Sequence, residues 1–525
     1  MVFQLIDIGN ADRFPRSHRK DETNSRARHN NNAEGPKPMD INTPTLLTFA
    51  AYLVAMLAFG FVAYRITTDL SDYILGGRSL GPGVTALSAG ASDMSGWLLL
   101  GLPGAVYAAG LGELWIGVGL VAGAWLNWLF VARRLRRFTA LADDALTIPD
   151  YLENRFGDSS RALRTISAIV ILVFFTLYIS AGLVGGGLLF ENTFGMDYST
   201  ALLVGAFVII SYTFLGGFLA VSWTDFFQDI LMFGTLLVVP MMAFVFIGGW
   251  GEVGEEVQAI DPSYSTLLEG MTVMGMISLL AWGLGYFGQP HILARFMAIR
   301  SEHDVPRAMT IGMTWMILAL VGAVATGYIG IAYFADAPLD DGETVLIMLI
   351  QALFNPWVAG VLLAAILAAI MSTIDSQLLV SSSALTNDFY KGFLRPNASQ
   401  TELVWVTRGA VIAVAVLATL LAMAPEAGVL QLVAYAWAGF GAAFGPVIIL
   451  SLFWRRMTRV GALAGMIIGA ITVIVWEQLS GGLFDLYEIV PGFVFCTIAV
   501  VVGSLLDKAP DASLTTSFDV DGSSQ

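Results

Sequence analysis

Stretches of mainly apolar residues recur along the chain from Pro44 to Leu506. Each stretch holds about 20 residues, which is long enough to cross the roughly 30 Å hydrocarbon layer of a membrane as a helix. The chain of 525 residues is 56% hydrophobic and only 13% charged, and its mean hydropathy is +0.73. We therefore predict an all-α polytopic membrane protein with about 13 transmembrane helices.

The two ends of the chain differ in composition from its apolar middle. Residues 1–40 are polar, mixed in charge and rich in Asn and Arg, without the apolar core of a signal peptide. We predict a disordered N-terminal extension over residues 1–40, a transmembrane domain over 41–507 and a short cytoplasmic tail over 508–525.

The distribution of basic residues predicts the orientation of the spans. Basic residues gather around the links after the predicted third, seventh, ninth and eleventh spans: Arg133, Arg134, Arg136, Arg137; Arg295, Arg300, Arg307; Lys391, Arg395, Arg408; Arg455, Arg456, Arg459. The links 250–269 and 336–343 carry acidic residues and neither Lys nor Arg. Because basic loops stay in the cytoplasm, we expect the N-terminus outside and the C-terminus inside.

The sequence disfavours several classes of function. The single Cys496 excludes a disulfide scaffold or a cysteine-rich metal site. The sequence contains no GxxxxGK[ST] phosphate loop and no Ser/His/Asp order of a hydrolase, so we expect neither a nucleotide-driven pump nor an enzyme, and no cofactor. The net charge of −15, which we expect in loops and tails, disfavours a nucleic-acid partner.

A carboxylate lies inside one apolar segment, in the run GASDMSGW at residues 90–97. Placing Asp93 near the middle of a bilayer costs about 2.5–3.5 kcal/mol, so intramembrane carboxylates usually serve a function. Gly90 and Gly96 weaken the helix around Asp93. A helix broken at this depth offers carbonyl groups to a cation and a positive half-helix end to an anion, which predicts an ion-coupled transport site.

A second apolar segment is interrupted at residues 282–290, which read WGLGYFGQP. Alone, this run is equally consistent with a kinked helix and aromatic packing. The Asp93 segment begins the first half of a possible five-plus-five inverted repeat, spans 2–6. The segment at residues 282–290 begins the second half, spans 7–11. Paired broken helices at matching positions indicate the central site of a transporter.

Small hydroxyl residues line one face of the predicted ninth span. Ala369, Ser372, Thr373 and Ser376 recur at spacings of three and four residues. They could serve as helix-packing contacts. We favour a cation site, because a hard cation such as sodium prefers several oxygen ligands. Asp375 places a carboxylate beside this face.

Asp225 lies at the predicted boundary between the fifth and sixth spans, in the run SWTD. Taken alone, a carboxylate at such a boundary is more often a helix cap or a loop charge than a ligand.

Four runs of residues resemble the sodium/solute symporter family, whose members have the leucine-transporter-type fold. They are residues 72–82 (DYILGGRSLGP), 90–97, 282–295 and 435–446 (YAWAGFGAAFGP). The resemblance covers roughly residues 40–510 and leaves out the N-terminal extension.

The resemblance implies a role for individual residues. Sodium would be held by the carbonyl groups of Ala91, Met94 and Ala369 and the hydroxyl groups of Ser372 and Thr373. Asp93 would be the essential carboxylate beside this site. L-Proline would be held by Ser95, Gly96, Tyr178, Trp282, Tyr286 and Pro290. Arg78 and Arg408 would support gating on the cytoplasmic side.

The resemblance also implies the function. We expect sodium-coupled import of L-proline by alternating access across a bacterial inner membrane, with sodium as the coupling ion and no obligate protein partner. The alternative within the family is another small solute, such as pantothenate or another carboxylate. A transporter-like membrane sensor would need an output domain, for which the tail after Leu506 is short, and a channel would not need the paired broken helices.

Asp375 departs from the pattern that the resemblance implies, because we expect a serine at this position in the best-known enterobacterial member of the family. Some relatives with other substrates hold a second sodium between this stretch and an aspartate that corresponds to Asp225. Asp225, Ser372, Asp375 and Ser376 are therefore a possible second cation site. The alternative is an Asp375 that is protonated or faces water.

Overall fold

The computed structural model describes residues 43–66, 74–215, 217–425 and 427–515. These residues form α-helices joined by short 3₁₀ and π-helical segments, and no β-strand occurs among them. The all-α prediction is therefore confirmed for this part of the chain. The predicted extension 1–40 and residues 516–525 of the predicted tail lie outside the described residues.

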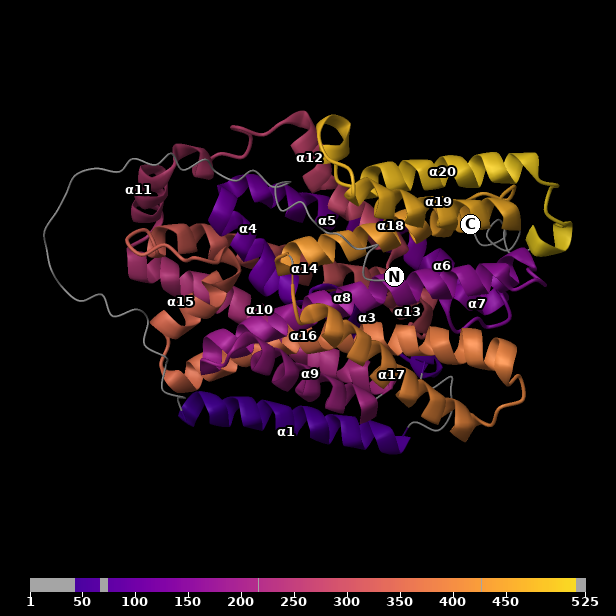
Figure 1. Ribbon diagram of the computed structural model, residues 1–525, viewed down its shortest axis with the longest axis horizontal. Coiled ribbons are helices and arrows are strands. Elements are labelled where there is room, and N and C mark those ends of the chain that lie inside the picture. Colours follow the sequence, from indigo (N-terminus) through magenta and orange to yellow (C-terminus); the bar gives the residue numbers. More distant parts are fainter. Residues whose placement is uncertain (1–42, 67–73, 216, 426, 516–525) are drawn as a thin grey trace, which may run out of the picture.

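The helices form one bundle (Figure 1). Those of the first half are α1 (Thr43–Ile66), α3 (Pro82–Asp93), α4 (Leu102–Ala109), α5 (Leu114–Leu126), α6 (Arg133–Leu141), α7 (Ile148–Phe156), α8 (Ala162–Phe194), α9 (Tyr198–Leu215) and α10 (Phe218–Ile247). Those of the second half are α11 (Trp250–Ile260), α12 (Val273–Leu280), α13 (Pro290–Ala298), α14 (Val305–Tyr333), α15 (Val345–Leu353), α16 (Pro356–Ser383), α17 (Gln400–Ala422), α18 (Val429–Phe453), α19 (Arg459–Glu477) and α20 (Ile489–Leu506).

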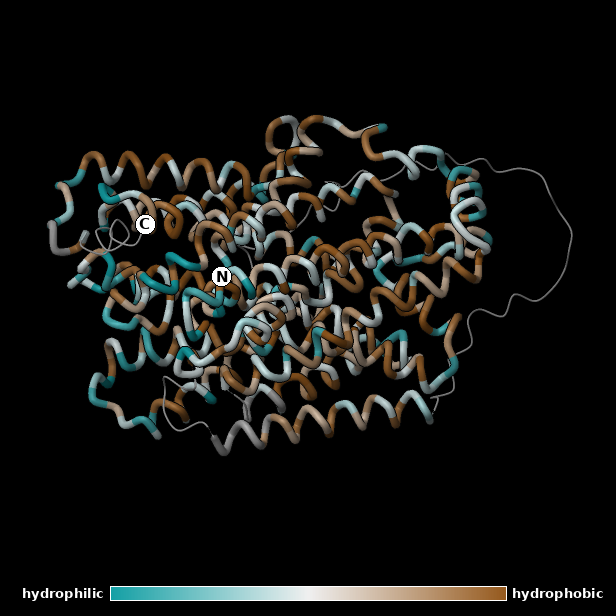
Figure 2. Tube along the Cα trace, turned by 180° about the vertical axis from the view of Figure 1, so that it is seen from behind, coloured by the Kyte–Doolittle hydropathy of each residue, from teal (hydrophilic) through white to brown (hydrophobic). Residues whose placement is uncertain are grey.

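Nine helical stretches of the described chain are long and apolar enough to cross a membrane, and four shorter apolar stretches accompany them. The hydrophobic colouring follows the lengths of the helices, whereas hydrophilic residues gather at the two ends of the bundle (Figure 2). Large apolar side chains also face outward: Phe207 is 74% exposed and Phe246 is 70% exposed. An apolar outer surface of this kind is what a lipid environment requires.

The helices that carry the predicted site lie in the interior of the bundle. The most apolar windows of α16 and α18 are 83% buried and that of α8 is 72% buried, compared with 33% for α20. In Figure 1, α8 and α16 lie near the centre, with α1 and α20 at opposite edges. A polar group on α16 is therefore shielded from both water and lipid.

Two spans are interrupted, as the sequence predicts. Helix α3 ends at Asp93, and Met94 leaves the helical conformation with ψ of 76° before a π-helical turn begins at Trp97. We call residues 94–96 the α3 break. Residues 281–288 form a 3₁₀ segment, and Gln289 is extended before Pro290 begins α13. We call residues 281–289 the α13 break.

The ends of α3 and α13 remote from these breaks are joined. Leu80 donates a backbone hydrogen bond to the Ala298 carbonyl (3.2 Å), and Arg300 donates one to the Leu80 carbonyl (2.9 Å). The two interrupted spans thus meet both at their breaks and at one end of the bundle.

Candidate functional site

Oxygen atoms of α3 and α16 converge at the α3 break. The Ala91 carbonyl accepts hydrogen bonds from the Ser372 hydroxyl (2.8 Å) and the Thr373 hydroxyl (3.1 Å). Ser372 also contacts the Ala369 carbonyl of its own helix at 3.0 Å. These four residues are at most 1% exposed. They form the arrangement of neutral oxygens that a small hard cation prefers.

Met94, the fifth residue predicted to bind sodium, caps the end of α3. Its N–H bonds to the Gly90 carbonyl at 2.8 Å, and its side chain is 1% exposed. No described contact joins the Met94 carbonyl to Ser372 or Thr373. The structure thus brings four of the predicted ligands together and places the fifth at the adjacent helix end.

Asp93 connects the two broken spans. Its carboxylate accepts a hydrogen bond from the Tyr286 hydroxyl in the α13 break. Its other carboxylate oxygen has no hydrogen-bond partner among the described residues. The Asp93 carbonyl accepts from the Trp97 indole at 3.0 Å, and the side chain is only 3% exposed. A charge buried at this position needs compensation, and a bound cation would supply it.

Aromatic rings surround the two breaks. The Trp97 and Trp282 rings lie 6.2 Å apart, and the Trp282 and Tyr487 rings lie 5.6 Å apart. Trp437 donates its indole hydrogen to the Trp282 carbonyl at 2.7 Å and packs edge-on against Tyr286. These contacts fix the irregular α13 break, whose backbone lacks the regular hydrogen bonds of an α-helix.

The residues predicted to bind the solute fall into two groups. Tyr178 on α8 is 1% exposed and interacts electrostatically with Asp93 and Ser95, so it faces the α3 break. Gly96 lies against α16, because a Cβ atom there would be 3.1 Å from Ile370. Pro290 lies at the first turn of α13 instead and lines a separate small cavity.

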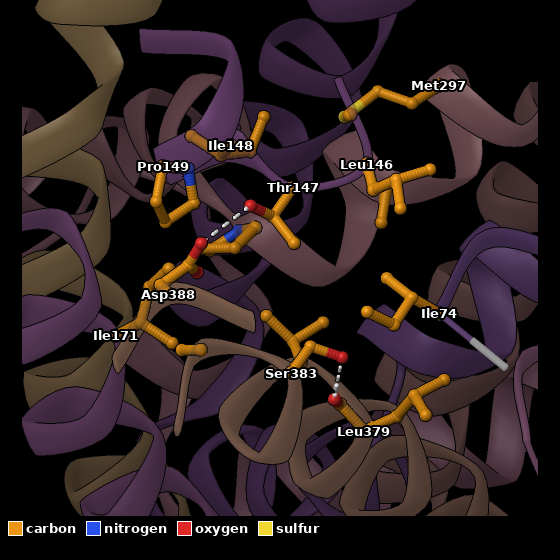
Figure 3. A pocket seen from close by; sticks show the side chains of 14 residues that line it. Ile74, Leu146, Thr147, Ile148, Pro149, Ile171, Met297, Leu379, Ser383 and Asp388 are labelled. Carbon is orange, nitrogen blue, oxygen red and sulfur yellow. Dashed lines mark hydrogen bonds between the residues drawn. The ribbon is translucent and has the colours of Figure 1, made fainter. Parts of the chain in front are cut away.

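That small cavity lies on the side of Pro290 away from the α13 break. It has a volume of about 20 Å³ and lies between α7, α13 and the end of α16 (Figure 3). Asp388 projects toward it and accepts a hydrogen bond from Thr147 at 3.4 Å (Figure 3). Arg164 pairs with the same carboxylate at 3.3 Å. The structure therefore leaves little open space beside Pro290, and an ion pair lies at the edge of this cavity.

Arg78 binds the ends of several elements. Its guanidinium donates to the carbonyls of Met297 and Ala145, both at 2.8 Å, and pairs with Asp144 at 2.8 Å. Burial lowers the pKa of Arg78, and the Asp144 carboxylate opposes that change. Arg408 lies on α17 with its guanidinium 5.0 Å from the Trp405 ring, and none of the described contacts of Arg78 involves α17.

The residues of the possible second cation site come from two helices: Asp225 lies on α10, and Ser372, Asp375 and Ser376 lie on α16. Asp225 and Asp375 are fully buried. Asp225 lies well inside α10, so its interpretation as a helix cap or loop charge is wrong. Asp375 contacts the Thr213 hydroxyl and does not face water. The Arg295 guanidinium lies between Asp225 (3.2 Å) and Ser376 (2.6 Å).

Sequence reasoning missed the role of Arg295. The sequence predicts that Arg295 lies in a link after the seventh span, whereas it lies inside α13 and is 0% exposed. Its position in the apolar run PHILARFMA was the available signal, because a lone charge in such a run is rarely exposed to lipid. Asp229 was also missed, and it is likewise fully buried on α10. The negative charge of the chain therefore does not lie only in loops and tails.

Known proteins resemble the chain along most of its length. It is 58% identical over 486 residues to the "Sodium/proline symporter" of Escherichia coli (strain K12), covering 91% of this chain and 96% of the relative. It is 56% identical over 467 residues to the "High-affinity proline transporter PutP" of Bacillus subtilis (strain 168), covering 88% of this chain and 98% of the relative.

A solved structure supports the fold. The substrate-bound, outward-open state of a Na⁺-coupled sialic acid symporter superposes with a TM-score of 0.76 at 21% identity, covering 90% of this chain and 100% of that one. The profile of the "Sodium:solute symporter family" matches residues 73–469. The chain belongs to the sodium:solute symporter family.

Proposed function

We propose that the protein imports L-proline together with sodium across the bacterial inner membrane. The proposal rests on one observation above all: the oxygens of Ala91, Ser372 and Thr373 meet at the α3 break. They do so in a chain 58% identical to a protein named as a sodium/proline symporter. Sodium is the coupling ion, and the protein is a transporter and not an enzyme.

Sodium binds at the end of α3 in this proposal, held by the carbonyls of Ala91, Met94 and Ala369 and the hydroxyls of Ser372 and Thr373. The hydroxyl groups now donate to carbonyl groups, so a cation among them would turn their lone pairs inward and replace these hydrogen bonds. Asp93 stabilises the ion through its negative charge. Among the described residues, no basic side chain forms an ion pair with Asp93, and one of its carboxylate oxygens has no hydrogen-bond partner.

Proline binds between the two breaks, where Ser95, Gly96, Tyr178, Trp282 and Tyr286 lie, with Pro290 at the inner end. Its carboxylate is attracted to the positive helix end that follows the α3 break, and its apolar ring suits the aromatic walls. A net-neutral zwitterion of this size needs no fixed basic residue. Tyr286, which contacts proline in this proposal, also donates a hydrogen bond to Asp93 beside the sodium site. This shared contact links the two sites and supports coupling.

We also propose thirteen spans with a five-plus-five inverted repeat; nine long apolar stretches and four shorter ones in the described chain support this proposal. Residues 341–343 of the acid-rich link line a cavity of about 570 Å³, much larger than the cavity of about 20 Å³ beyond Pro290. With the acid-rich links outside, the described state is wider on the outer side and closed on the inner side. Impermeant thiol reagents should label Asp340→Cys from outside and Arg455→Cys only from inside, and the reverse would overturn the orientation.

Arg78 supports the closed inner side in this proposal, because it joins the loop before α3 to the end of α13 and to Ala145. The same region contains the backbone contacts between Leu80 and α13. Opening toward the cytoplasm requires these contacts to break. We also assign Arg408 a supporting role in inward gating, through α17.

Two accounts of the second cation residues stay in the proposal. In one, Asp225, Ser372, Asp375 and Ser376 hold a second sodium in part of the cycle. In the other, Asp375 is protonated. Its complete burial supports a protonated or bound state rather than a water-facing one.

Counterflow of labelled proline in liposomes tests the substrate. We expect exchange that requires sodium and that unlabelled proline inhibits, whereas pantothenate leaves it unchanged. Inhibition by pantothenate but not by proline would favour the alternative solute. Non-saturable flux would indicate a channel, and absence of flux with retained binding would indicate a sensor.

A further inference from the structure

The small cavity beside Pro290 combines an apolar wall with a single charged group (Figure 3). Its volume of about 20 Å³ is enough for one water-sized group. Apolar side chains form most of its wall, among them Ile74, Leu146, Ile148 and Ile171. Of the described residues that line it, three carry polar side chains: Thr147, Ser383 and Asp388.

Asp388 supplies the charge of this cavity, and its side chain is only 1% exposed. One of its carboxylate oxygens accepts hydrogen bonds from Thr147 (3.4 Å) and Asn387 (3.2 Å) and pairs with Arg164 (3.3 Å). The other oxygen has no hydrogen-bond partner among the described residues. Because a buried carboxylate oxygen without a donor is costly, this atom is suited to a ligand that donates a hydrogen bond.

The charges around Asp388 are unbalanced. Arg164 pairs with Asp388 and also with Asp150 and Glu153 of α7. These four side chains are between 1% and 17% exposed, and no second basic side chain of the described chain pairs with any of the three carboxylates. One guanidinium thus faces three carboxylates where little water reaches them, so a ligand with a positive charge would be stabilised here.

The lining of the cavity favours an organic cation over a metal ion. A hard cation such as sodium prefers many oxygen ligands, whereas the lining side chains offer one carboxylate and two hydroxyl groups. An ammonium group on a compact apolar body uses both features of the cavity, because its N–H groups donate to the carboxylate and its body packs on the apolar wall. L-Proline has this chemistry, with two N–H donors and an apolar ring.

We propose that Asp388 forms an inner subsite for the ammonium group of the solute, which proline occupies between the two breaks and the cytoplasm. This inference rests on the proposed function and on its orientation. Pro290 links the two places, because it directly follows the α13 break and also lines the cavity. Since proline is larger than the cavity, the subsite fills when the inner side opens.

Ser383 offers a second acceptor for the ammonium group. Its hydroxyl donates to the Leu379 carbonyl of its own helix at 2.7 Å (Figure 3). The Ser383 oxygen accepts no hydrogen bond within the described chain, so its lone pairs are available to the second N–H group of proline.

Transport measured separately from each face of the membrane tests the subsite. Inside-out and right-side-out vesicles present the inner and the outer face to labelled proline at equal sodium. In Asp388→Asn, the half-saturating proline concentration at the inner face should rise about tenfold, because a charge-assisted hydrogen bond is lost. The value at the outer face should stay at that of the parent. Asp388→Glu keeps the charge and should raise the inner value less.

Uptake by the parent from the outer face reports the proposed function by itself. If that uptake depends on sodium but the inner value of Asp388→Asn equals that of the parent, the subsite is overturned and the proposed function stands. A rise in the half-saturating sodium concentration alone at the inner face would identify the ion as the occupant and would also overturn the subsite.

A purely structural role of the ion pair gives a different result. If Asp388 only held the inner side closed, Asp388→Asn would favour the inward-open state, so the inner value would fall and the outer value would rise. Arg164→Gln is the matched control, because it breaks the same ion pair but keeps the Asp388 carboxylate, and its inner value should not rise. An equal rise in Arg164→Gln and Asp388→Asn would overturn the subsite.

Should Asp388→Asn fail to reach the membrane, Ser383→Ala decides. It removes one acceptor and leaves the ion pair intact, so the inner half-saturating proline concentration should rise about threefold or more, with the outer value unchanged. An inner value equal to that of the parent would overturn the subsite.

Discussion

Asp93 and Ser372 show how single polar residues are tolerated in the interior of this membrane protein. Each lies where a helix ends or where another helix approaches it, so each finds a partner outside its own helix. The same positions leave oxygen atoms incompletely satisfied, as with the second oxygen of Asp93. Such atoms are available to an ion.

The charge of Asp93 is expected to be indispensable. Asp93→Asn keeps an oxygen for the Tyr286 hydroxyl but removes the negative charge, so sodium binding should weaken by at least about tenfold. Sodium-stimulated uptake should disappear while the protein stays in the membrane at its normal level. Asp340→Asn, at an exposed position, is the matched control. Uptake at the parent level in Asp93→Asn would refute this role.

Ser372 and Thr373 are expected to bind sodium through their hydroxyl groups. Removing either hydroxyl in Ser372→Ala or Thr373→Ala should raise the half-saturating sodium concentration about tenfold or more, with less effect on maximal uptake. Thr373→Ser keeps the oxygen and should resemble the parent. Thr419→Ala is the control, since that buried hydroxyl bonds only the Ala415 carbonyl of its own helix among the contacts described. An unchanged sodium dependence in both Ala variants would favour helix packing as their role.

At the scale of elements, the α13 break depends on close contact with α5. A Cβ atom on Gly283 would lie 2.2 Å from the Gly119 carbonyl oxygen, and one on Gly123 would lie 2.0 Å from the Gly283 carbonyl oxygen. The two backbones therefore touch without intervening side chains. Only glycine allows this approach, and it holds the irregular segment in place.

Gly283→Ala should therefore destabilise the protein. Overpacking of this kind costs about 1–3 kcal/mol, because the backbones of α5 and the α13 break must separate. Thermal unfolding of the purified protein should show a lower midpoint than for the parent. Gly234→Ala on α10 is the control, since a Cβ atom there meets no heavy atom within 4 Å. Equal midpoints for both variants would contradict the close packing.

The sequence predicted the two interrupted spans and the hydroxyl face of α16, because glycine, proline and helical spacing are local signals. It did not predict that Asp225 pairs with Arg295, since these residues come from different helices and pair only when the bundle forms. From the sequence, Arg295 is expected in a loop, whereas α13 extends from Pro290 to Ala298 and includes it. The contact between Asp93 and Tyr286 also depends on packing, although both residues were singled out.

At the scale of the whole molecule, the two cavities differ in size on either side of the breaks. The cavity of about 570 Å³ includes residues of α4, α8 and α18, whereas the cavity of about 20 Å³ lies beyond Pro290. An alternating-access cycle would exchange this asymmetry, opening the side that Arg78 and Leu80 now hold closed. Transport should therefore require the backbone hydrogen bonds between Leu80 and the end of α13 to break during the cycle.

The energy available for this cycle can be estimated for one sodium ion. A cation that moves through 100 mV releases about 2.3 kcal/mol, and a tenfold concentration gradient adds about 1.4 kcal/mol. Together these two terms support a ratio of inside to outside proline of about several hundredfold. Two sodium ions would square that ratio.

Accumulation of labelled proline in proteoliposomes tests the central claim most directly. With a tenfold inward sodium gradient and an imposed inside-negative potential of 100 mV, proline should accumulate to a ratio of at least several hundredfold. A sodium ionophore together with dissipation of the potential should abolish accumulation. Equal accumulation with potassium in place of sodium, or proline that only equilibrates across the membrane, would contradict sodium-coupled import.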